Sequence, residues 1–222
     1  MADSRNSVRA VLFDLDGTLA DTAPDMAGAL AALCEERQLE PLPYAQVRPV
    51  VSHGSRGLVR LSFGDSLTDD EMTVLCERFL VHYQHRLAEQ TSLFEGMHTV
   101  LEALEVRSMP WGIVTNKPGW LTEPLIRTLG LESLSGCVIS GDTVSQRKPD
   151  PLPLTHAAEA LRIEPKDCLY VGDAERDIVA GNAAGMKTLV ALYGYIDGHE
   201  QPEHWGADGT VKTPEEILEW LN

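Results

Sequence analysis

The 222-residue chain has few cysteines, and their spacing argues against the usual cysteine-based sites. Cys34, Cys76, Cys137 and Cys168 lie far apart and form no Cys-x-x-Cys pair. Neither a disulfide framework nor a cysteine-ligated metal cluster is therefore expected. A free cysteine within an apolar run is usually a small buried hydrophobic residue.

Long apolar segments and clustered positive charge are lacking as well. No stretch approaches the roughly 18 apolar residues that a membrane span needs, and the N-terminal residues lack the three-part pattern of a signal peptide. The chain has 18 Lys and Arg against 34 Asp and Glu, which gives a formal net charge of −16. Because nucleic-acid binding depends on clustered Lys and Arg, we expect a cytoplasmic protein that binds neither nucleic acid nor a membrane.

Short apolar runs recur along the chain and predict strands. They span residues 8–13, 111–114, 137–139, 168–171 and 187–192. Stretches with apolar residues at helical spacing separate the later runs. Strands that alternate with helices in this way indicate an α/β fold with a Rossmann-like parallel sheet and helices on both faces. In such sheets ligands bind at the carboxyl ends of the strands.

Residues 21–89 interrupt this alternation, because they show helical patterns and no convincing strand. Thr68 and Glu71 have the spacing of a capping box, which predicts the start of a helix. We therefore expect two units. One is a core formed by residues 1–20 and 90–222, and the other is a small all-helical cap, residues 21–89, inserted after the first strand.

Two acidic residues, Asp14 and Asp16, directly follow the first predicted strand. Side chains two residues apart on an extended chain point the same way, so both carboxylates are expected to face one cavity. Carboxylates this close repel each other, and a divalent cation relieves the repulsion. Mg²⁺ is the natural choice because it prefers oxygen ligands. An Asp-x-Asp-Gly segment is also an ordinary turn composition, so this segment alone leaves a structural role open.

Polar side chains also follow the later predicted strands. Thr115 and Asn116 offer a hydroxyl and an amide to a phosphate oxygen, although Thr115 could equally be a helix N-cap. Lys148 lies in a loop, where most lysines are simply solvated. Asp173 follows a further strand, and Asp177 lies one helical turn later, which is also common at helix N-termini. The joint pattern is hard to explain by structure alone and predicts a phosphate site.

These motifs resemble those of the haloacid dehalogenase-type phosphatases over essentially the whole chain. Residues 14–18 resemble the first motif of that family and Thr115 the second. Lys148 resembles the third motif, and Asp173 with Asp177 resembles the fourth. The resemblance implies that residues 21–89 form the small cap that such enzymes close over their substrate.

The resemblance also implies a mechanism. Asp14 would attack phosphorus and form a phospho-aspartate, and Asp16 would protonate the leaving alcohol and later accept a proton from water. Mg²⁺ would be held by Asp14, by Asp173 and by the main-chain carbonyl of Asp16. Four carboxylates and a phosphate dianion would carry about −6 against +1 from Lys148, and unit charges about 4 Å apart repel by about 4 kcal/mol. The metal is therefore expected to be required.

Further residues are assigned to substrate binding. By the resemblance, Thr115, Asn116 and Lys148 would hold the phosphoryl oxygens, and Asp177 would orient Lys148 or a metal-bound water. In the cap, residues 52–57 read as a glycine-flanked loop that could bring Arg56 over a polar or anionic group of the substrate. A solvent-facing arginine in a flexible loop is an equally good interpretation.

Within the family, the chain is similar to the phosphoglycolate phosphatases. Four stretches look closer to the N-acetylmuramic acid 6-phosphate phosphatases of cell-wall recycling, namely residues 93–97, 111–118, 193–196 and 205–208. This implies a monomer or weak dimer that hydrolyses a small phosphate ester, N-acetylmuramic acid 6-phosphate, with 2-phosphoglycolate as the alternative. A phosphoglucomutase-type isomerase keeps the same core residues, and a catalytically inactive phosphosugar-binding regulator is the non-enzyme alternative.

Overall fold

A six-stranded parallel sheet forms the centre of the molecule in a computed structural model, which describes residues 8–221. The strands lie in the order β5-β4-β1-β6-β7-β8, and every neighbouring pair is parallel. Their bounds are Ala10–Phe13 for β1, Trp111–Val114 for β4, Cys137–Ile139 for β5, Cys168–Gly172 for β6, Lys187–Ala191 for β7 and Gly209–Val211 for β8. The predicted Rossmann-like α/β sheet is confirmed.

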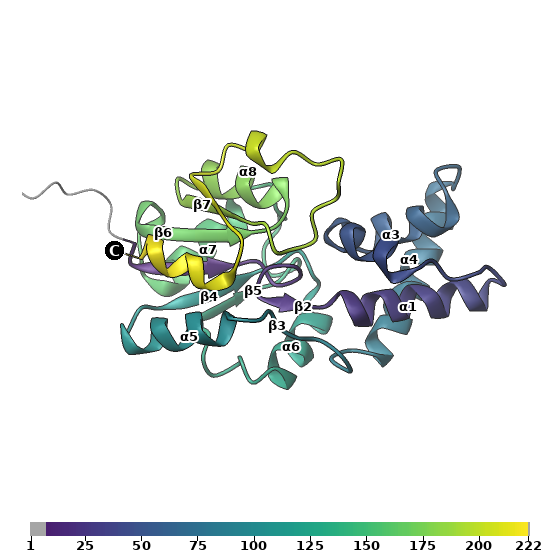
Figure 1. The fold of residues 1–222 in the computed structure, drawn as a ribbon, viewed down its shortest axis with the longest axis horizontal. Helices are drawn as coiled ribbons and strands as arrows, with labels where there is room; N and C mark the ends of the chain where they lie inside the picture. Colours follow the sequence, from purple (N-terminus) through teal and green to yellow (C-terminus); the bar gives the residue numbers. More distant parts are fainter. Residues whose placement is uncertain (1–7, 222) are drawn as a thin grey trace, which may run out of the picture.

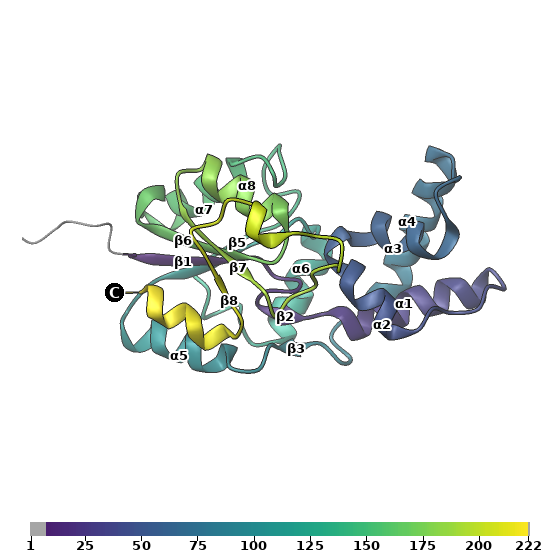
Figure 2. The ribbon, with the colours of Figure 1, turned by 45° about the horizontal axis from the view of Figure 1, so that its top comes forward.

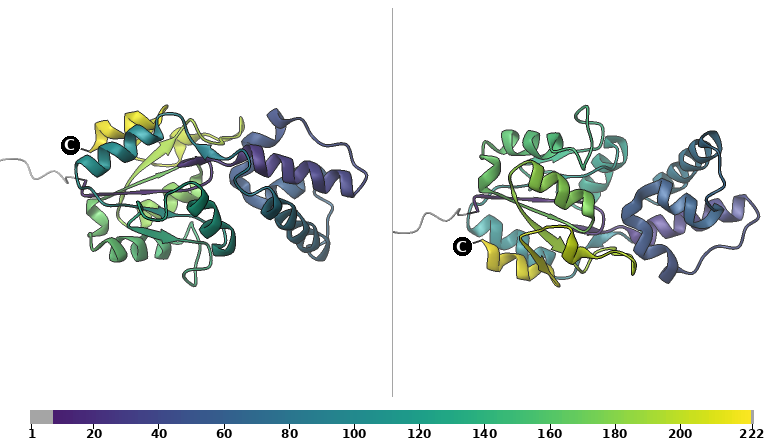
Figure 3. Two further views of the ribbon diagram at one scale, coloured as in Figure 1. Left: turned by 90° about the horizontal axis from the view of Figure 1, so that it is seen from below. Right: turned by 90° about the horizontal axis from the view of Figure 1, so that it is seen from above.

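Helices cover both faces of this sheet (Figure 2 and Figure 3). One face packs against α5, α6 and the C-terminal 3₁₀ helix η4, and the other packs against α7 and α8. The side chains of β1 divide between the two cores, because Val11 and Phe13 belong to one and Ala10 and Leu12 to the other. This two-residue period is that of a strand buried on both faces. The bounds are Met97–Val106 for α5, Gly119–Thr128 for α6, Leu152–Leu161 for α7, Glu175–Ala183 for α8 and Pro214–Trp220 for η4.

A helical cap lies at one end of the sheet (Figure 1). It contains α1, Ala23–Glu36; α2, Tyr44–Val47; the 3₁₀ helix η1, Arg48–His53; α3, Gly54–Phe63; and α4, Asp69–His85. The cap has its own apolar core, in which residues of α1, α3 and α4 meet. The predicted capping box is confirmed, since Thr68 and Glu71 bond each other's main-chain N–H groups at the start of α4.

A short antiparallel ribbon joins the cap to the core. The ribbon consists of β2, Ala20–Asp21, and β3, Ser92–Leu93, so the chain leaves and returns side by side. The buried carboxylate of Asp25, in α1, accepts hydrogen bonds from the main-chain N–H groups of Gln90 and Thr91 and from the Thr91 hydroxyl. The proposed boundaries of the cap fall in and beside this ribbon, and residues 1–7 of the proposed core lie outside the described residues.

Three details differ from the sequence prediction. The prediction of a loop at residues 52–57 was wrong, because these residues belong to η1 and α3. Buried Val51, Leu58 and Val59 pack into the cap core, and this packing overrides the low helix propensity of the nearby glycines. The β1 strand starts two residues later than predicted, and the short strands β2, β3 and β8 were not predicted at all. Among residues 8–221, no helix has the length and hydrophobicity to cross a bilayer.

The two shortest 3₁₀ helices lie in connections around the sheet. They are η2, Pro165–Asp167, directly before β6, and η3, Pro202–His204, between β7 and β8. Trp205 follows η3 and packs with Ile178 and Val190 in a small buried cluster. The connection between β7 and β8 therefore has a core contact of its own and also supplies residues to the site described next.

Candidate active site

Three buried carboxylates meet at the carboxyl ends of the central strands. Asp14 follows β1, Asp173 follows β6, and Asp177 lies in the first turn of α8. These side chains converge because β1 and β6 are paired neighbours in the parallel sheet. One oxygen from each of the three lies within 4.8 Å of the others, and the three residues are at most 2% exposed. Carboxylate oxygens in this arrangement are a suitable ligand set for Mg²⁺.

The ammonium group of Lys148 lies within this acidic cluster. Its Nζ is 2.9 Å from Asp14 Oδ1 and 2.7 Å from Asp177 Oδ1. It also donates to the Val114 carbonyl and to the Tyr170 hydroxyl, so this buried cation is held on several sides. Lys148 therefore bridges two of the three carboxylates.

The side chain of Asn116 fixes the main chain of Lys148. Its amide nitrogen donates to the Lys148 carbonyl at 2.9 Å, and its amide oxygen accepts from the Lys148 N–H at 3.0 Å. The amide that was expected to hold phosphoryl oxygens is thus engaged with the protein itself. Thr115 is buried at the end of β4, and its hydroxyl accepts a hydrogen bond from the N–H of Lys117.

The carboxylate of Asp16 does not join the acidic cluster. Its Oδ1 accepts hydrogen bonds from Thr22 Oγ1 and from Lys117 Nζ, both at 2.7 Å. The expectation that Asp14 and Asp16 face the same way assumed an extended chain, but β1 ends at Phe13 and the chain then turns. Gly17 makes the turn possible with a φ of +84°, and a Cβ at this position would collide with Asp173.

The cap reaches the acidic cluster through Ser52. Its hydroxyl donates to Asp173 Oδ2 at 2.6 Å, and the main-chain N–H of Tyr195 donates to the same oxygen at 2.9 Å. Beside this contact, the Arg48 guanidinium donates to the carbonyls of Tyr193 and Gly194 and lies 5.0 Å from the centre of the Tyr195 ring. These cap–core contacts were not found from the sequence.

Arg56 is not brought to the site. It lies on α3, its side chain is 59% exposed, and its Nη2 is 3.5 Å from Asp69 of the cap. Of the candidate residues named from the sequence, the structure gathers Asp14, Lys148, Asp173 and Asp177 into one cluster.

Burial and mutual repulsion change the acidity of the cluster. Burial and the charge of Asp177 raise the pKa of Asp14 to about 6, although Lys148 opposes the shift. Burial and the charges of Asp14 and Asp177 raise the pKa of Asp173 to about 7, with Ser52 opposing. Burial opposes ionisation of Asp177 too, but Lys148 and Arg176 outweigh it and lower its pKa. Fully ionising all three groups near neutral pH therefore calls for an additional cation.

The site holds more positive charge than expected. Lys117 is paired with Asp16, and Arg176 Nη2 lies 4.0 Å from Asp14 Oδ2. The expectation of a single cation was wrong, because with Lys148 the four aspartates face three cations. A phosphate dianion would still leave a net charge of about −3, so the case for a divalent ion is reduced but persists.

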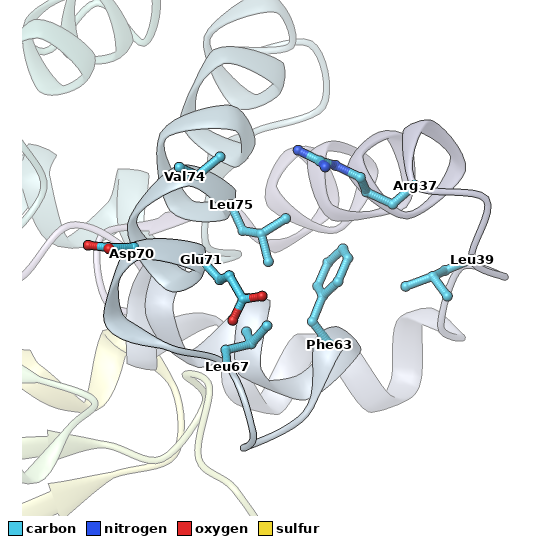
Figure 4. Close-up of a pocket in the computed structure, with 8 residues that line it drawn as sticks. All are labelled: Arg37, Leu39, Phe63, Leu67, Asp70, Glu71, Val74 and Leu75. Carbon is cyan, nitrogen blue, oxygen red and sulfur yellow. The ribbon is translucent and has the colours of Figure 1, made fainter.

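A separate hollow lies in the cap, away from these carboxylates (Figure 4). Its volume is about 480 Å³, and none of the acidic-cluster residues lines it. Its Glu71 is already engaged by Thr68 at the start of α4. The lining residues are Arg37, Leu39, Phe63, Leu67, Asp70, Glu71, Val74 and Leu75. The acidic cluster, in contrast, is covered where the cap meets the core.

Known proteins resemble this chain over nearly its whole length. Residues 11–191 match the family model of the haloacid dehalogenase-like hydrolases. A phosphoglycolate phosphatase of Xanthomonas campestris pv. campestris (strain 8004) is 44% identical over 211 residues, or 95% of each chain. N-acetylmuramic acid 6-phosphate phosphatase of Pseudomonas aeruginosa is 41% identical over 218 residues, or 98% of this chain and 96% of the relative.

The fold is also shared with solved structures. The crystal structure of a predicted phosphoglycolate phosphatase from Haemophilus somnus 129PT gives a TM-score of 0.85 at 26% identity. The match covers 97% of this chain and 98% of that one, so it includes core and cap together.

Proposed function

Because the chain belongs to the haloacid dehalogenase-like hydrolase family, we propose that it is a Mg²⁺-dependent phosphatase that forms a phospho-aspartate on Asp14. The observation that carries the proposal is the buried group of three carboxylates with the Lys148 ammonium between two of them. An anionic phosphoryl group is stable there only if cations offset the acidic charge. Bound Mg²⁺ would supply that charge, with Asp14, Asp173 and the main-chain carbonyl of Asp16 as the proposed ligands.

Asp14 is the proposed nucleophile. Its Oδ1 accepts a hydrogen bond from the Leu15 N–H at 2.8 Å and is paired with Lys148, which fixes the carboxylate. Its Oδ2 lies on the side of Arg176, 4.0 Å from that guanidinium. Attack on phosphorus breaks the ester bond and releases the alcohol, and water then hydrolyses the phospho-aspartate to return the free carboxylate and inorganic phosphate.

Asp16 is the proposed acid and base. Thr22 and Lys117 hold one of its oxygens, so its position is fixed independently of the acidic cluster. In the first step it would give a proton to the leaving oxygen, and in the second it would take one from the attacking water. Its separation from the Asp14 cluster suits this division of roles.

The cap is proposed to exclude water during the reaction. Asp14 is 2% exposed, Asp173 is 0% exposed and Lys148 is 3% exposed, so the cap has to move for a substrate to reach them. Closing the cap removes bulk water and strengthens each electrostatic interaction in the site. The Ser52 and Arg48 contacts are the links that would break and re-form.

N-acetylmuramic acid 6-phosphate is the proposed substrate, which assigns the enzyme to peptidoglycan recycling. The support is the whole-length similarity to a phosphatase of that name. 2-Phosphoglycolate is the second candidate, because relatives of comparable identity carry that name. The two are separated by measuring phosphate release from both esters under the same conditions. A kcat/KM for 2-phosphoglycolate far above that for N-acetylmuramic acid 6-phosphate would contradict the first assignment.

The catalytic proposal is tested by trapping the intermediate. Enzyme quenched during turnover of a ³²P-labelled ester is expected to carry label on Asp14, and EDTA is expected to abolish both labelling and phosphate release. Steady release of inorganic phosphate also separates a hydrolase from a phosphoglucomutase-type isomerase and from an inactive regulator. Hydrolysis that persists in EDTA without protein-bound label would refute the mechanism.

A further inference from the structure

The ammonium group of Lys117 is a buried cation with unused hydrogen-bonding capacity. Its side chain is 5% exposed, and its Nζ donates to Asp16 Oδ1 at 2.7 Å. An ammonium carries three N–H donors, so with Asp16 and the adjacent Tyr83 side chain as partners one N–H of Lys117 is still left for a ligand. Burial lowers the Lys117 pKa, but the interactions with Asp16 and Tyr83 together outweigh it and raise the pKa, so the group stays charged at neutral pH.

The cap provides a second unused donor beside it. The centre of the Tyr83 ring, in α4, lies 4.6 Å from Lys117 Nζ, and Tyr83 is 1% exposed. The Tyr83 hydroxyl is buried without a hydrogen-bond partner among the described residues. An unpartnered buried hydroxyl is costly, so such groups call for an explanation in a folded protein. Lys117 of the core and Tyr83 of the cap thus place hydrogen-bond donors side by side.

The other cations near the site are committed elsewhere. Lys148 bridges Asp14 and Asp177, and the Arg48 guanidinium binds main-chain carbonyls of the core. Arg176 approaches Asp14 rather than Asp16. Among the described residues, Lys117 is therefore the cation that adjoins the proposed acid and retains a donor for a ligand.

We infer that Lys117 and Tyr83 bind a carboxylate on the leaving group, so that the enzyme prefers phosphate esters of hydroxy acids. The inference rests on the proposed function, because it takes Asp16 to contact the leaving oxygen. One hydrogen bond of about 2.7 Å on each side of the Asp16 carboxylate puts the ammonium within about 8 Å of that oxygen. A carboxylate on a small leaving group lies within this distance of the ammonium. It would accept hydrogen bonds from a free N–H of Lys117 and from the Tyr83 O–H together.

The test compares esters that differ in the carboxylate. One pair is 2-phosphoglycolate and ethyl phosphate, and the other is N-acetylmuramic acid 6-phosphate and N-acetylglucosamine 6-phosphate. The measured quantity is the ratio of kcat/KM within each pair. For the better-used pair we expect the ratio to fall at least tenfold in Lys117→Gln and several-fold in Tyr83→Phe. Arg60→Gln, an exposed cap cation, and Lys166→Gln, an exposed core cation, are matched controls that keep the wild-type ratio.

Two further outcomes decide the matter. If Lys117→Gln and Tyr83→Phe lower both members of a pair in parallel and leave the ratio unchanged, the two residues only position Asp16 and the inference is overturned. If Lys117→Gln does not fold, the wild-type enzyme still gives an answer: glycolate should inhibit hydrolysis of p-nitrophenyl phosphate competitively and ethylene glycol should not, and Tyr83→Phe should weaken the glycolate inhibition. Absence of phosphate release from every ester in the wild type would instead refute the proposed function.

Discussion

Removing Mg²⁺ is expected to make the stability of this protein fall as the pH rises from about 4 to about 7. The perturbation acts on Asp14 and Asp173, whose pKa values are raised from 3.8 to about 6 and about 7 by burial and by neighbouring carboxylates. Their protonated forms are favoured in the folded protein. Each group therefore stabilises the fold fully below the unfolded pKa of 3.8, and this stabilisation is lost as the pH rises through the folded pKa.

The magnitude follows from the size of the two shifts. At about 1.4 kcal/mol per pH unit, the shift of Asp14 corresponds to about 3 kcal/mol and that of Asp173 to about 4 kcal/mol. These values are upper limits, because the two groups interact and the folded protein relaxes when they ionise. The lowered pKa of Asp177 does not oppose the change, since its stabilisation is already complete above pH 3.8. A net loss of several kcal/mol is expected across the window.

The assay is urea unfolding at pH 5 and pH 8, in EDTA and in saturating Mg²⁺. In EDTA the free energy of unfolding should be several kcal/mol lower at pH 8, and Mg²⁺ should restore most of the loss because it binds the ionised carboxylates. Asp173→Asn should reduce the pH dependence, whereas Asp70→Asn, an exposed carboxylate in α4, should leave it unchanged. Equal or greater stability at pH 8 in EDTA would refute the electrostatic reasoning.

Four substitutions test the roles of single residues. Asp14→Asn should lower kcat at least about a thousandfold with little change in the unfolding midpoint, and near-normal turnover would exclude Asp14 as nucleophile. Asn116→Ala removes two hydrogen bonds to the main chain of Lys148, so kcat/KM should fall about tenfold or more; an unchanged value would show that Lys148 is fixed without it. Arg48→Ala should raise KM about tenfold, because it removes hydrogen bonds between cap and core. Arg56→Ala should change kcat/KM less than about twofold, because the Arg56 side chain is 59% exposed in a surface ion pair. A larger loss of kcat/KM in Arg56→Ala than in Arg48→Ala would restore Arg56 as the substrate contact.

The convergence of the acidic cluster could be predicted because one physical rule governs it. The buried apolar runs of β1, β4 and β6 are each followed by a polar side chain, and parallel strands present their carboxyl ends at one edge of the sheet. Asp14 and Asp173 follow neighbouring strands and meet for that reason. The short β8 strand, Gly209–Val211, has only one fully buried residue and so carries no comparable apolar signal.

The features that were missed depend on where the chain turns and on what packs across the cap. The direction of Asp16 is set by the end of β1 at Phe13, a boundary that periodicity does not resolve to one residue. Ser52 meets Asp173 only because the cap core positions η1 over the sheet edge. Lys117 and Arg176 could have been suspected from the sequence, since each is a cation within two residues of a motif residue. The sequence does not reveal, however, whether such a side chain points into the site or away from it.

The paired strands β2 and β3 make the cap a single excursion from the core. The chain departs at Ala20–Asp21 and returns beside it at Ser92–Leu93, and the buried Asp25 carboxylate ties the returning segment to the first helix of the cap. Everything between these strands is thereby attached at one place, and no strand of the large sheet lies within it. The cap can consequently be exchanged or redesigned as one module, while the sheet keeps the register that assembles the carboxylates.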